Sequence, residues 1–278
     1  MKCKTRRSDS LLLGTDAEFF LELDGKIVPA SYIIPGTKDN PAELDNGVCH
    51  PDGLSLEVAC PPSDTARGML TNLMNVLEEV KVKYLDPAGV KIFNGCTIDL
   101  NEDVHPDYPP RGFDLEFGCG AEIPAWYNHS RFIQYKRASM DSPTSHLRHS
   151  GFHIHFGFTE GMQESVASVT DISNAVKFLD MAVYRLNIGT TRNRAEQYGG
   201  YGAFRIKPYG FEYRALDCTV ITNRAKFEHL LKLLEVSPAL LETAASSKCT
   251  VTTTAIAPQN TVRGCVHDYR TVLSKIGL

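Results

Sequence analysis

Four groups of charged or imidazole side chains lie inside otherwise apolar segments, where charges are rarely placed without a partner. The first group is Asp16 and Glu18, in the segment 14–19. Residues two apart on an extended strand point to the same face, and we expect this pair at the start of a strand. Two carboxylates on one face repel each other unless a cation lies between them. The pair is therefore typical of a metal site, although a solvent-exposed polar strand end has the same spacing.

The second group is a single carboxylate, Glu57, in the segment LSLEVAC at 54–60. Alternation along a strand places Ser55, Glu57 and Ala59 on one face and the apolar residues on the other. This face is small and polar, and it carries one candidate metal ligand. A strand at the protein surface would show the same pattern.

The third group is the pair His153 and His155, in the segment GFHIHFG at 151–157. The two imidazoles share a strand face, so both can approach one ion or one phosphate from the same side. The alternative is a pair of structural histidines whose hydrogen bonds are satisfied inside the protein.

The fourth group consists of Arg205, Lys207, Glu212 and Arg214, on two strand-like runs separated by 208–210. If 208–210 is a tight turn, the four side chains are cross-strand neighbours. Cations beside a carboxylate suit a polyphosphate bridged by a metal ion, in which Glu212 holds the metal and the cations contact the oxygens. A ladder of ordinary salt bridges is the alternative.

Together, the four groups offer many carboxylate oxygens and one or two imidazoles, a set that favours Mg²⁺ or Mn²⁺ over zinc. The sequence has no Walker-type loop, no G-x-G-x-x-G dinucleotide loop and no G-x-S-x-G elbow. A bound phosphate would therefore be held by metal ions and cationic side chains on a sheet.

The elements that must position these groups follow from hydrophobic periodicity and turn residues. We expect a hairpin around Asp24-Gly25 between 18–23 and 27–28. Helices are expected at 63–84, at 163–186 and at 223–234, the last ending before Pro238. Further strands are expected at 54–60, 90–93, 152–158, 202–207 and 211–216. Because strands and helices do not alternate strictly, the pattern predicts an α+β fold with a largely antiparallel sheet covered by helices on one face.

The composition argues against a general nucleic-acid-binding protein and against a membrane-spanning or secreted protein. The chain has 278 residues, 42% of them apolar, and a formal net charge of -4, which gives no general attraction to nucleic acid or to an anionic membrane. We find no apolar run long enough to span a membrane and no signal-peptide core. Eight cysteines without a C-x-x-C pair favour reduced thiols in a cytoplasmic protein. We expect one domain over 1–278, with its core at about 11–235 and a flexible arm at 1–10.

Several segments, spread from about residue 11 to 235, resemble a known family. They are GTDAEFFLEL, PGTKDNP, LSLEVACPP, FGCGAEIPAWYN, HSGFHIHFGF and YGAFRIKPYGFEYRALD. The sequence is similar to the phage-associated carboxylate–amine (COOH–NH2) ligases of the glutamine synthetase and glutamate–cysteine ligase superfamily. The last two segments are the most specific of the set.

This resemblance implies a glutamine-synthetase-like curved, largely antiparallel sheet with helices packed on its convex face. Its concave face would bind ATP and two or more Mg²⁺ (or Mn²⁺) ions. A carboxylate would be activated as an acyl phosphate, and an amine would then displace phosphate. The substrates would be a small-molecule or peptide carboxylate and an amine, in the host cytoplasm if the protein is phage-encoded. The identity of the substrates and the oligomeric state stay open.

The resemblance also implies roles for individual residues. The implied metal ligands are Asp16, Glu18, Glu57, His153 and Glu212. The residues implied to contact the nucleotide or its phosphates are His155, Arg205, Lys207 and Arg214, of which His155, Arg205 and Arg214 would take part in catalysis. A carboxylate must accept the proton of the amine, and the candidates are Glu116, Glu122 and Asp217.

The sequence departs from the family at three points. Phe152, instead of a second glycine, precedes the H-x-H pair, residues 120–124 replace an acidic proline-containing stretch, and Asp16 stands where many relatives have Glu. Two other interpretations also remain. One is a non-catalytic nucleotide- or metabolite-binding module of the same fold, as a virion or regulatory component. The other is a metal-dependent hydrolase that uses His153 and His155.

Overall fold

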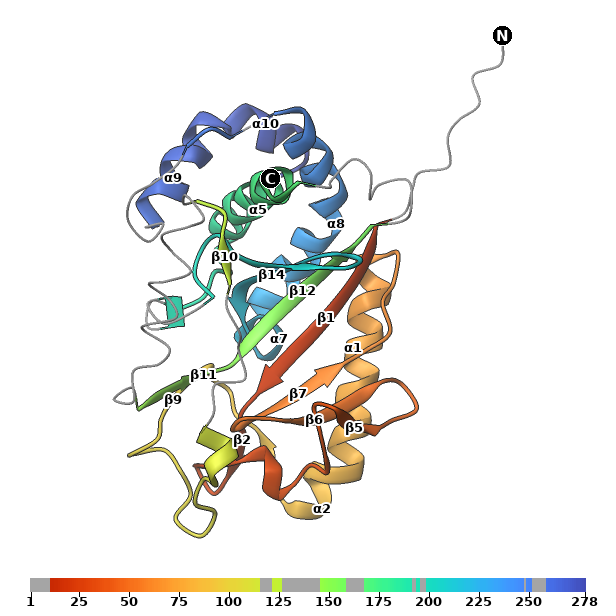
Figure 1. Ribbon diagram of the computed structural model, residues 1–278, viewed down its shortest axis with the longest axis vertical. Helices are drawn as coiled ribbons and strands as arrows, with labels where there is room; N and C mark the ends of the chain where they lie inside the picture. The colour runs from red at the N-terminus through yellow and green to blue at the C-terminus, as the bar shows by residue number, and fades with distance from the viewer. Residues whose placement is uncertain are drawn as a thin grey trace.

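The computed structural model describes residues 11–115, 122–126, 146–158, 168–191, 194–195, 199–247, 249–251 and 259–278 (Figure 1). The arm predicted at 1–10 lies outside these residues. No helix among them is both long and apolar enough to span a membrane.

A nine-stranded antiparallel sheet forms the centre of the fold. Its strand order is β10-β13-β14-β12-β1-β7-β6-β5-β4. The strands are β1 (Leu12–Phe19), β4 (Gly36–Thr37), β5 (Asn40–Glu43), β6 (Val48–Asp52), β7 (Ser55–Ala59), β10 (Ile123–Pro124), β12 (Gly151–Gly157), β13 (Ala203–Lys207) and β14 (Gly210–Asp217). The strand runs predicted at 54–60, 152–158, 202–207 and 211–216 are therefore confirmed within one or two residues.

Alternation along these strands gives the sheet one apolar face and one polar face. On β1, for example, Ala17 and Phe19 are fully buried in the hydrophobic core, whereas Asp16 and Glu18 point to the opposite side. Two long helices, α1 (Ala66–Val80) and α5 (Val169–Leu186), pack against the sheet, and a third, α8 (Arg224–Ser246), packs against both of them (Figure 1). The predicted α+β class with a large antiparallel sheet and packed helices is confirmed.

Each long helix begins at a side-chain cap. Thr65 caps α1 by accepting a hydrogen bond from the Gly68 backbone N–H, and Ser168 caps α5 in the same way through the N–H of Asp171. Asn223 caps α8. The helix predicted at 63–84 begins at Ala66 and the helix predicted at 163–186 begins at Val169, so both predicted starts are too early.

Two tight turns that the sequence predicted are present. β2 (Leu21–Leu23) and β3 (Lys26–Val28) pair around Asp24-Gly25, whose φ angles are 51° and 79°. In β13–β14, Lys207 pairs with Gly210 around a two-residue loop, and Arg205 therefore lies directly opposite Glu212. This register places the predicted cations beside the predicted carboxylate.

The remaining elements are short or lie at the C-terminal end. They are η1 (Ala30–Tyr32), the π-helical turn η2 (Lys81–Leu85), α2 (Asp86–Ala88), β8 (Lys91–Ile92), β9 (Thr97–Asp99), η3 (Gly112–Leu115), β11 (Leu147–His149), α7 (Thr219–Thr222), α9 (Gln259–Asp268) and α10 (Arg270–Lys275). Strands β2, β3 and β8 form one small sheet, and β9 and β11 form another.

Two further predictions about element boundaries are wrong. Asp16 and Glu18 lie inside β1, which begins at Leu12, and not at the start of a strand. Helix α8 does not end before Pro238 but continues to Ser246. A proline inside a helix costs about 3 kcal/mol. We attribute the continuation to residues beyond the proline, including the fully buried Leu240, which keep the apolar stripe of the helix on the core.

A buried carboxylate links α5 to the sheet. Asp180 accepts hydrogen bonds from the Trp126 indole at 2.5 Å and from the Tyr213 hydroxyl at 2.7 Å. Burial raises the pKa of Asp180 to about 7, although both hydrogen bonds act in the opposite direction. The native protein therefore keeps this group protonated at a pH where the unfolded chain has already released the proton.

Candidate active site

The polar face brings the predicted residues onto five neighbouring strands. The strands are β13 with Arg205 and Lys207, β14 with Glu212 and Arg214, β12 with His153 and His155, β1 with Asp16 and Glu18, and β7 with Glu57. Ion pairs and hydrogen bonds connect neighbouring members of this set. The side chains differ in charge along the row, so the site has an acidic end near β7 and a cationic end near β13.

The acidic end contains three carboxylates. Glu18 lies directly opposite Glu57 in the β1–β7 pairing, and Asp52 reaches the pair from β6. One oxygen from each lies within 4.8 Å of the other two, a spacing that a single metal ion can bridge. We refer to Glu18, Asp52 and Glu57 as the acid trio. The sequence interpretation missed Asp52, although Asp52-Gly53 is a hairpin signal that could have indicated it.

The acid trio is electrostatically unfavourable without a cation. Burial raises the pKa of Glu18, and the charge of Asp52 adds to this effect while Arg214 opposes it. Burial, together with the charges of Glu18 and Asp16, raises the pKa of Glu57 well above its ordinary value. A divalent cation would remove the repulsion and favour the ionised forms.

Two buried histidines next to these carboxylates have ring nitrogens without hydrogen-bond partners in the described part of the chain. In His50, on β6, neither nitrogen has such a partner, and Nε2 lies 3.5 Å from Glu57 Oε1. In His153 the atom is Nε2, while Nδ1 lies 3.4 Å from Glu212 Oε1 and 3.8 Å from Glu18 Oε1. Burial lowers the pKa of His153 well below its usual value, and the nearby Arg214 adds to this effect. The neutral imidazole keeps a lone pair for a ligand.

His153 needs the glycine that precedes it by two residues. A Cβ atom added to Gly151 would lie 2.5 Å from His153 Nε2 and 2.8 Å from an Arg194 guanidinium nitrogen. The Gly151 N–H also donates a hydrogen bond to Glu18 Oε2 at 2.7 Å. Gly151 thus leaves space for the imidazole and holds a member of the acid trio, and Phe152 faces the core.

The cationic end is organised around Glu212. Its carboxylate contacts Lys207 Nζ at 2.9 Å, Arg205 Nη1 at 4.0 Å and the Arg214 guanidinium. Burial alone would raise the pKa of Glu212, but Arg214, Lys207 and Arg205 outweigh this effect and lower it. Arg214 is fixed on its other side, where Nε donates to Glu122 Oε1 at 2.9 Å. Glu212 is therefore an ionised carboxylate beside three cations.

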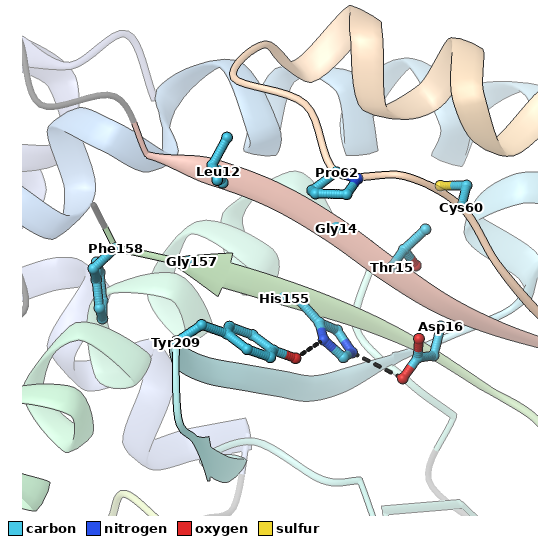
Figure 2. A pocket seen from close by; sticks show the side chains of 10 residues that line it. All are labelled: Leu12, Gly14, Thr15, Asp16, Cys60, Pro62, His155, Gly157, Phe158 and Tyr209. Atoms are coloured by element: carbon cyan, nitrogen blue, oxygen red, sulfur yellow. Dashed lines mark hydrogen bonds and ion pairs between the residues drawn. The ribbon is translucent and has the colours of Figure 1, made fainter. Parts of the chain in front are cut away.

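Asp16 forms an ion pair with His155, instead of joining Glu18 in one group of carboxylates. His155 Nε2 lies 3.0 Å from Asp16 Oδ2, and His155 Nδ1 is hydrogen-bonded to the Tyr209 hydroxyl, so the three side chains form a row (Figure 2). Burial alone would raise the pKa of Asp16, but the hydrogen bond from His155 and the charges of His155, Lys207 and Lys38 lower it. Sequence reasoning did not identify Tyr209, which belongs to the predicted turn.

A cavity of about 340 Å³ adjoins this row. Gly14 and Gly157 lie on its floor, and Leu12, Cys60, Pro62 and Phe158 line its sides, while Asp16, His155 and Tyr209 form its polar end (Figure 2). The cavity is on the same sheet face as the charged groups, because Leu12, Gly14 and Asp16 alternate along β1. An elongated ligand could therefore place a flat apolar group in the cavity and its charged part on the polar face.

The three candidates for the proton acceptor have different positions. Glu116 lies outside the described residues. Glu122 is buried, and it accepts hydrogen bonds from Arg214 and from the Gly199 N–H at 3.1 Å. Asp217 is fully buried and accepts the Thr191 N–H at 3.2 Å and the Thr219 N–H at 3.0 Å. Glu122 and Asp217 therefore hold neighbouring groups in place, and neither is selected as the base.

A comparison with models of protein families supports the resemblance over part of the chain. The model of the family described as "Phage phiEco32-like COOH.NH2 ligase-type 2" matches residues 129–252, and it supports a carboxylate–amine ligase. The matched segment contains β12, β13 and β14, whereas the acid trio lies outside it. A search among curated proteins gives no match.

Among solved structures, the chain is similar to the "bifunctional glutathione synthetase from Pasteurella multocida", with 14% identity and a TM-score of 0.43. The similarity covers 97% of this chain and 45% of that chain. The protein thus spans less than half the length of this structure, and a likeness at this TM-score supports no conclusion about fold or activity.

Proposed function

We propose that this protein is an ATP- and Mg²⁺-dependent ligase that joins a carboxylate to an amine through an acyl phosphate, on a glutamine-synthetase-like sheet. The observation that carries the proposal is the charge order on one sheet face. The acid trio lies at one end, Glu212 with three cations lies at the other, and the neutral imidazole of His153 lies between them.

The residues fit a hard divalent cation. Carboxylate oxygens are the preferred ligands of Mg²⁺. Glu18, Asp52 and Glu57 would hold one ion, and the neutral imidazole of His153, whose Nδ1 lies 3.4 Å from Glu212 Oε1, would hold a second ion together with Glu212. When bound, Mg²⁺ would neutralise charge on the phosphate oxygens during transfer.

Lys207, Arg205 and Arg214 would bind the phosphate oxygens of ATP. Their cationic groups surround Glu212, and Lys207 and Arg205 are about a quarter exposed, so both can reach a ligand from the solvent side. The cavity beside His155 and Tyr209 is close to these cations and has the apolar sides that a purine ring requires. We therefore assign the base of the nucleotide to this cavity and its phosphates to the cationic end.

In the proposed reaction a carboxylate oxygen attacks the γ-phosphorus of ATP and ADP leaves. The nitrogen of the amine then attacks the carbonyl carbon of the acyl phosphate, and phosphate leaves. The protein would contribute mainly position and charge: Arg214 is held by Glu122 and Glu212 and would stabilise the transferred phosphoryl group without reorganising. The amine loses one proton as the amide forms, to a group that is still unassigned.

Two measurements on the full chain test this function. ADP release should require Mg²⁺, a carboxylate and an amine together. With an ¹⁸O-labelled carboxylate, one label should appear in the released phosphate, because an oxygen of the carboxylate becomes the bridging oxygen of the acyl phosphate. Binding of Mg-ATP without ADP release from any substrate pair would instead favour a non-catalytic nucleotide-binding module.

A further inference from the structure

We propose that Lys38, on the hairpin formed by β4 and β5, binds the carboxylate group of the substrate. The inference rests on the proposed function and assigns the hairpin segment PGTKDNP to the carboxylate side of the site. It concerns the acidic end, where the proposed reaction requires an anion to approach other anions.

The hairpin holds the backbone of Lys38 in a defined place. Thr37 pairs with Asn40, so Lys38 and Asp39 form a two-residue turn, and the Asn40 N–H donates to Thr37 Oγ1 at 3.2 Å. Gly36 has a φ of +88°, and a Cβ atom there would lie 2.8 Å from backbone atoms of Asn40 and Ala42. The turn is thus built for close packing, and it directs Lys38 from the edge strands toward the acid trio.

The side chain of Lys38 reaches the acid trio but stays accessible. Its Nζ atom lies 3.7 Å from Asp52 Oδ2 and 4.0 Å from Glu57 Oε2, while the side chain is 59% exposed. Both separations exceed the 2.7–2.9 Å typical of a charge-assisted hydrogen bond. The ammonium group therefore forms ion pairs with the two carboxylates and faces the solvent beside them.

The charge balance explains why a cation is needed here. Three ionised carboxylates with one Mg²⁺ ion carry a net charge of about -1, by counting formal charges. A substrate carboxylate that approaches the ion would meet this residual negative charge. The positive charge of Lys38 cancels this residual charge. Lys38 also lies on the solvent-facing side of the acid trio, from which a substrate would arrive.

The cationic end would then bind the phosphates of ATP, and Lys38 at the acidic end would bind the substrate carboxylate. Lys207 and Arg205 surround Glu212 beside the proposed nucleotide cavity, whereas Lys38 stands at the opposite end, beyond Glu57. A lysine ammonium is a compact charge with three donors and does not impose bidentate geometry. It can bind one carboxylate oxygen and leave the other free to attack the γ-phosphorus.

The test compares the wild type with Lys38→Met, Lys38→Arg and a control, Lys91→Met, which removes an exposed lysine paired with Glu22 outside the site. Thermal melting first establishes Mg-ATP binding by each protein. The wild type is then screened with Mg-ADP and millimolar acetate, succinate, glycine, L-alanine or L-glutamate. The dissociation constant of the most stabilising compound is measured for every variant.

We expect Lys38→Met to weaken binding of that carboxylate about tenfold or more, through loss of one charge-assisted contact. Lys38→Arg should stay close to the wild type, Lys91→Met should match it, and Mg-ATP binding should persist in all four proteins. Unchanged carboxylate affinity in Lys38→Met overturns the inference and leaves Lys38 as a counter-ion of the acid trio. So does a wild type that binds Mg-ATP but no carboxylate. Failure of the wild type to bind Mg-ATP would instead refute the proposed function.

Discussion

Replacing Glu57 with glutamine should make the metal-free protein more stable and abolish most of its stabilisation by Mg²⁺. Glu57 lies opposite Glu18, and one oxygen of each lies within 4.8 Å of the other and of Asp52. At this separation two unit charges repel by about 3.5 kcal/mol for an effective dielectric constant near 20. Partial protonation of Glu57 and the nearby ammonium of Lys38 relieve part of this repulsion. We therefore expect a gain of about 1–2 kcal/mol, or roughly 2–4 °C in Tm.

The pH dependence has a definite sign. The pKa of Glu57 is raised in the folded protein, so the unfolded chain releases this proton at a lower pH than the native protein does. The contribution of Glu57 to the free energy of unfolding therefore falls as pH rises from about 4.5 through the raised pKa. Glutamine cannot ionise, so the gain of Glu57→Gln in EDTA should be larger at pH 8 than at pH 4.

Thermal melting in EDTA and in excess Mg²⁺ measures both effects. Ligand at ten times its dissociation constant stabilises a protein by about 1.4 kcal/mol, and Glu57→Gln should lose most of this increment. Glu43→Gln, at an exposed position on β5, is the matched control and should behave as the wild type. Equal destabilisation of Glu57→Gln in EDTA and in Mg²⁺ would mean that Glu57 is a structural hydrogen-bonding residue, and the metal assignment would be wrong.

Three further predictions concern the rest of the molecule. Tyr209→Phe removes the hydroxyl that holds His155, and calorimetry should show Mg-ATP binding weakened by a few-fold to about tenfold with Tm nearly unchanged; equal affinity would contradict a positioning role. Gly151→Ala places a Cβ atom 2.5 Å from His153 Nε2 and should weaken Mg²⁺-dependent stabilisation while circular dichroism still reports a folded chain; unchanged stabilisation would exclude His153 from the metal site. Because the pKa of Asp180 is raised from 3.8 to about 7, its contribution to stability should fall as pH rises between these values, by up to about 4 kcal/mol. Urea unfolding at pH 5 and pH 8 should show a smaller difference for Asp180→Asn than for the wild type, and an equal difference would refute this assignment.

The row of charged residues could be predicted because strand alternation and turn chemistry are local properties of the sequence. The two-residue β13–β14 turn fixes Arg205 opposite Glu212, so the cationic end follows from residues close together in the chain. The same holds for the Asp24-Gly25 hairpin and for the start of α8, which was predicted at 223 and lies at Arg224.

The acidic end depends on contacts between distant segments, which periodicity does not encode. Asp52 joins Glu18 through the pairing of β6 with β7 and of β7 with β1. The partner of Asp16 likewise comes from β12, where His155, diagonal to Asp16 in the register, forms an ion pair with its carboxylate. The end of α8 was predicted too early, before Pro238, because the free-energy cost of a proline in a helix is a local property. The stabilisation from burying Leu240 depends on tertiary packing, which the local sequence does not show. The single-domain prediction over 1–278 and the identity of the general base stay predictions.

Calorimetric titration of the full chain with ATP tests the central claim most directly, since the claim is that one sheet face binds Mg-ATP through Glu212 and the cations around it. We predict binding that requires Mg²⁺ and weakens at least about tenfold in a folded Glu212→Ala variant. ATP binding of equal strength with and without Mg²⁺, or unchanged in Glu212→Ala, would contradict the account.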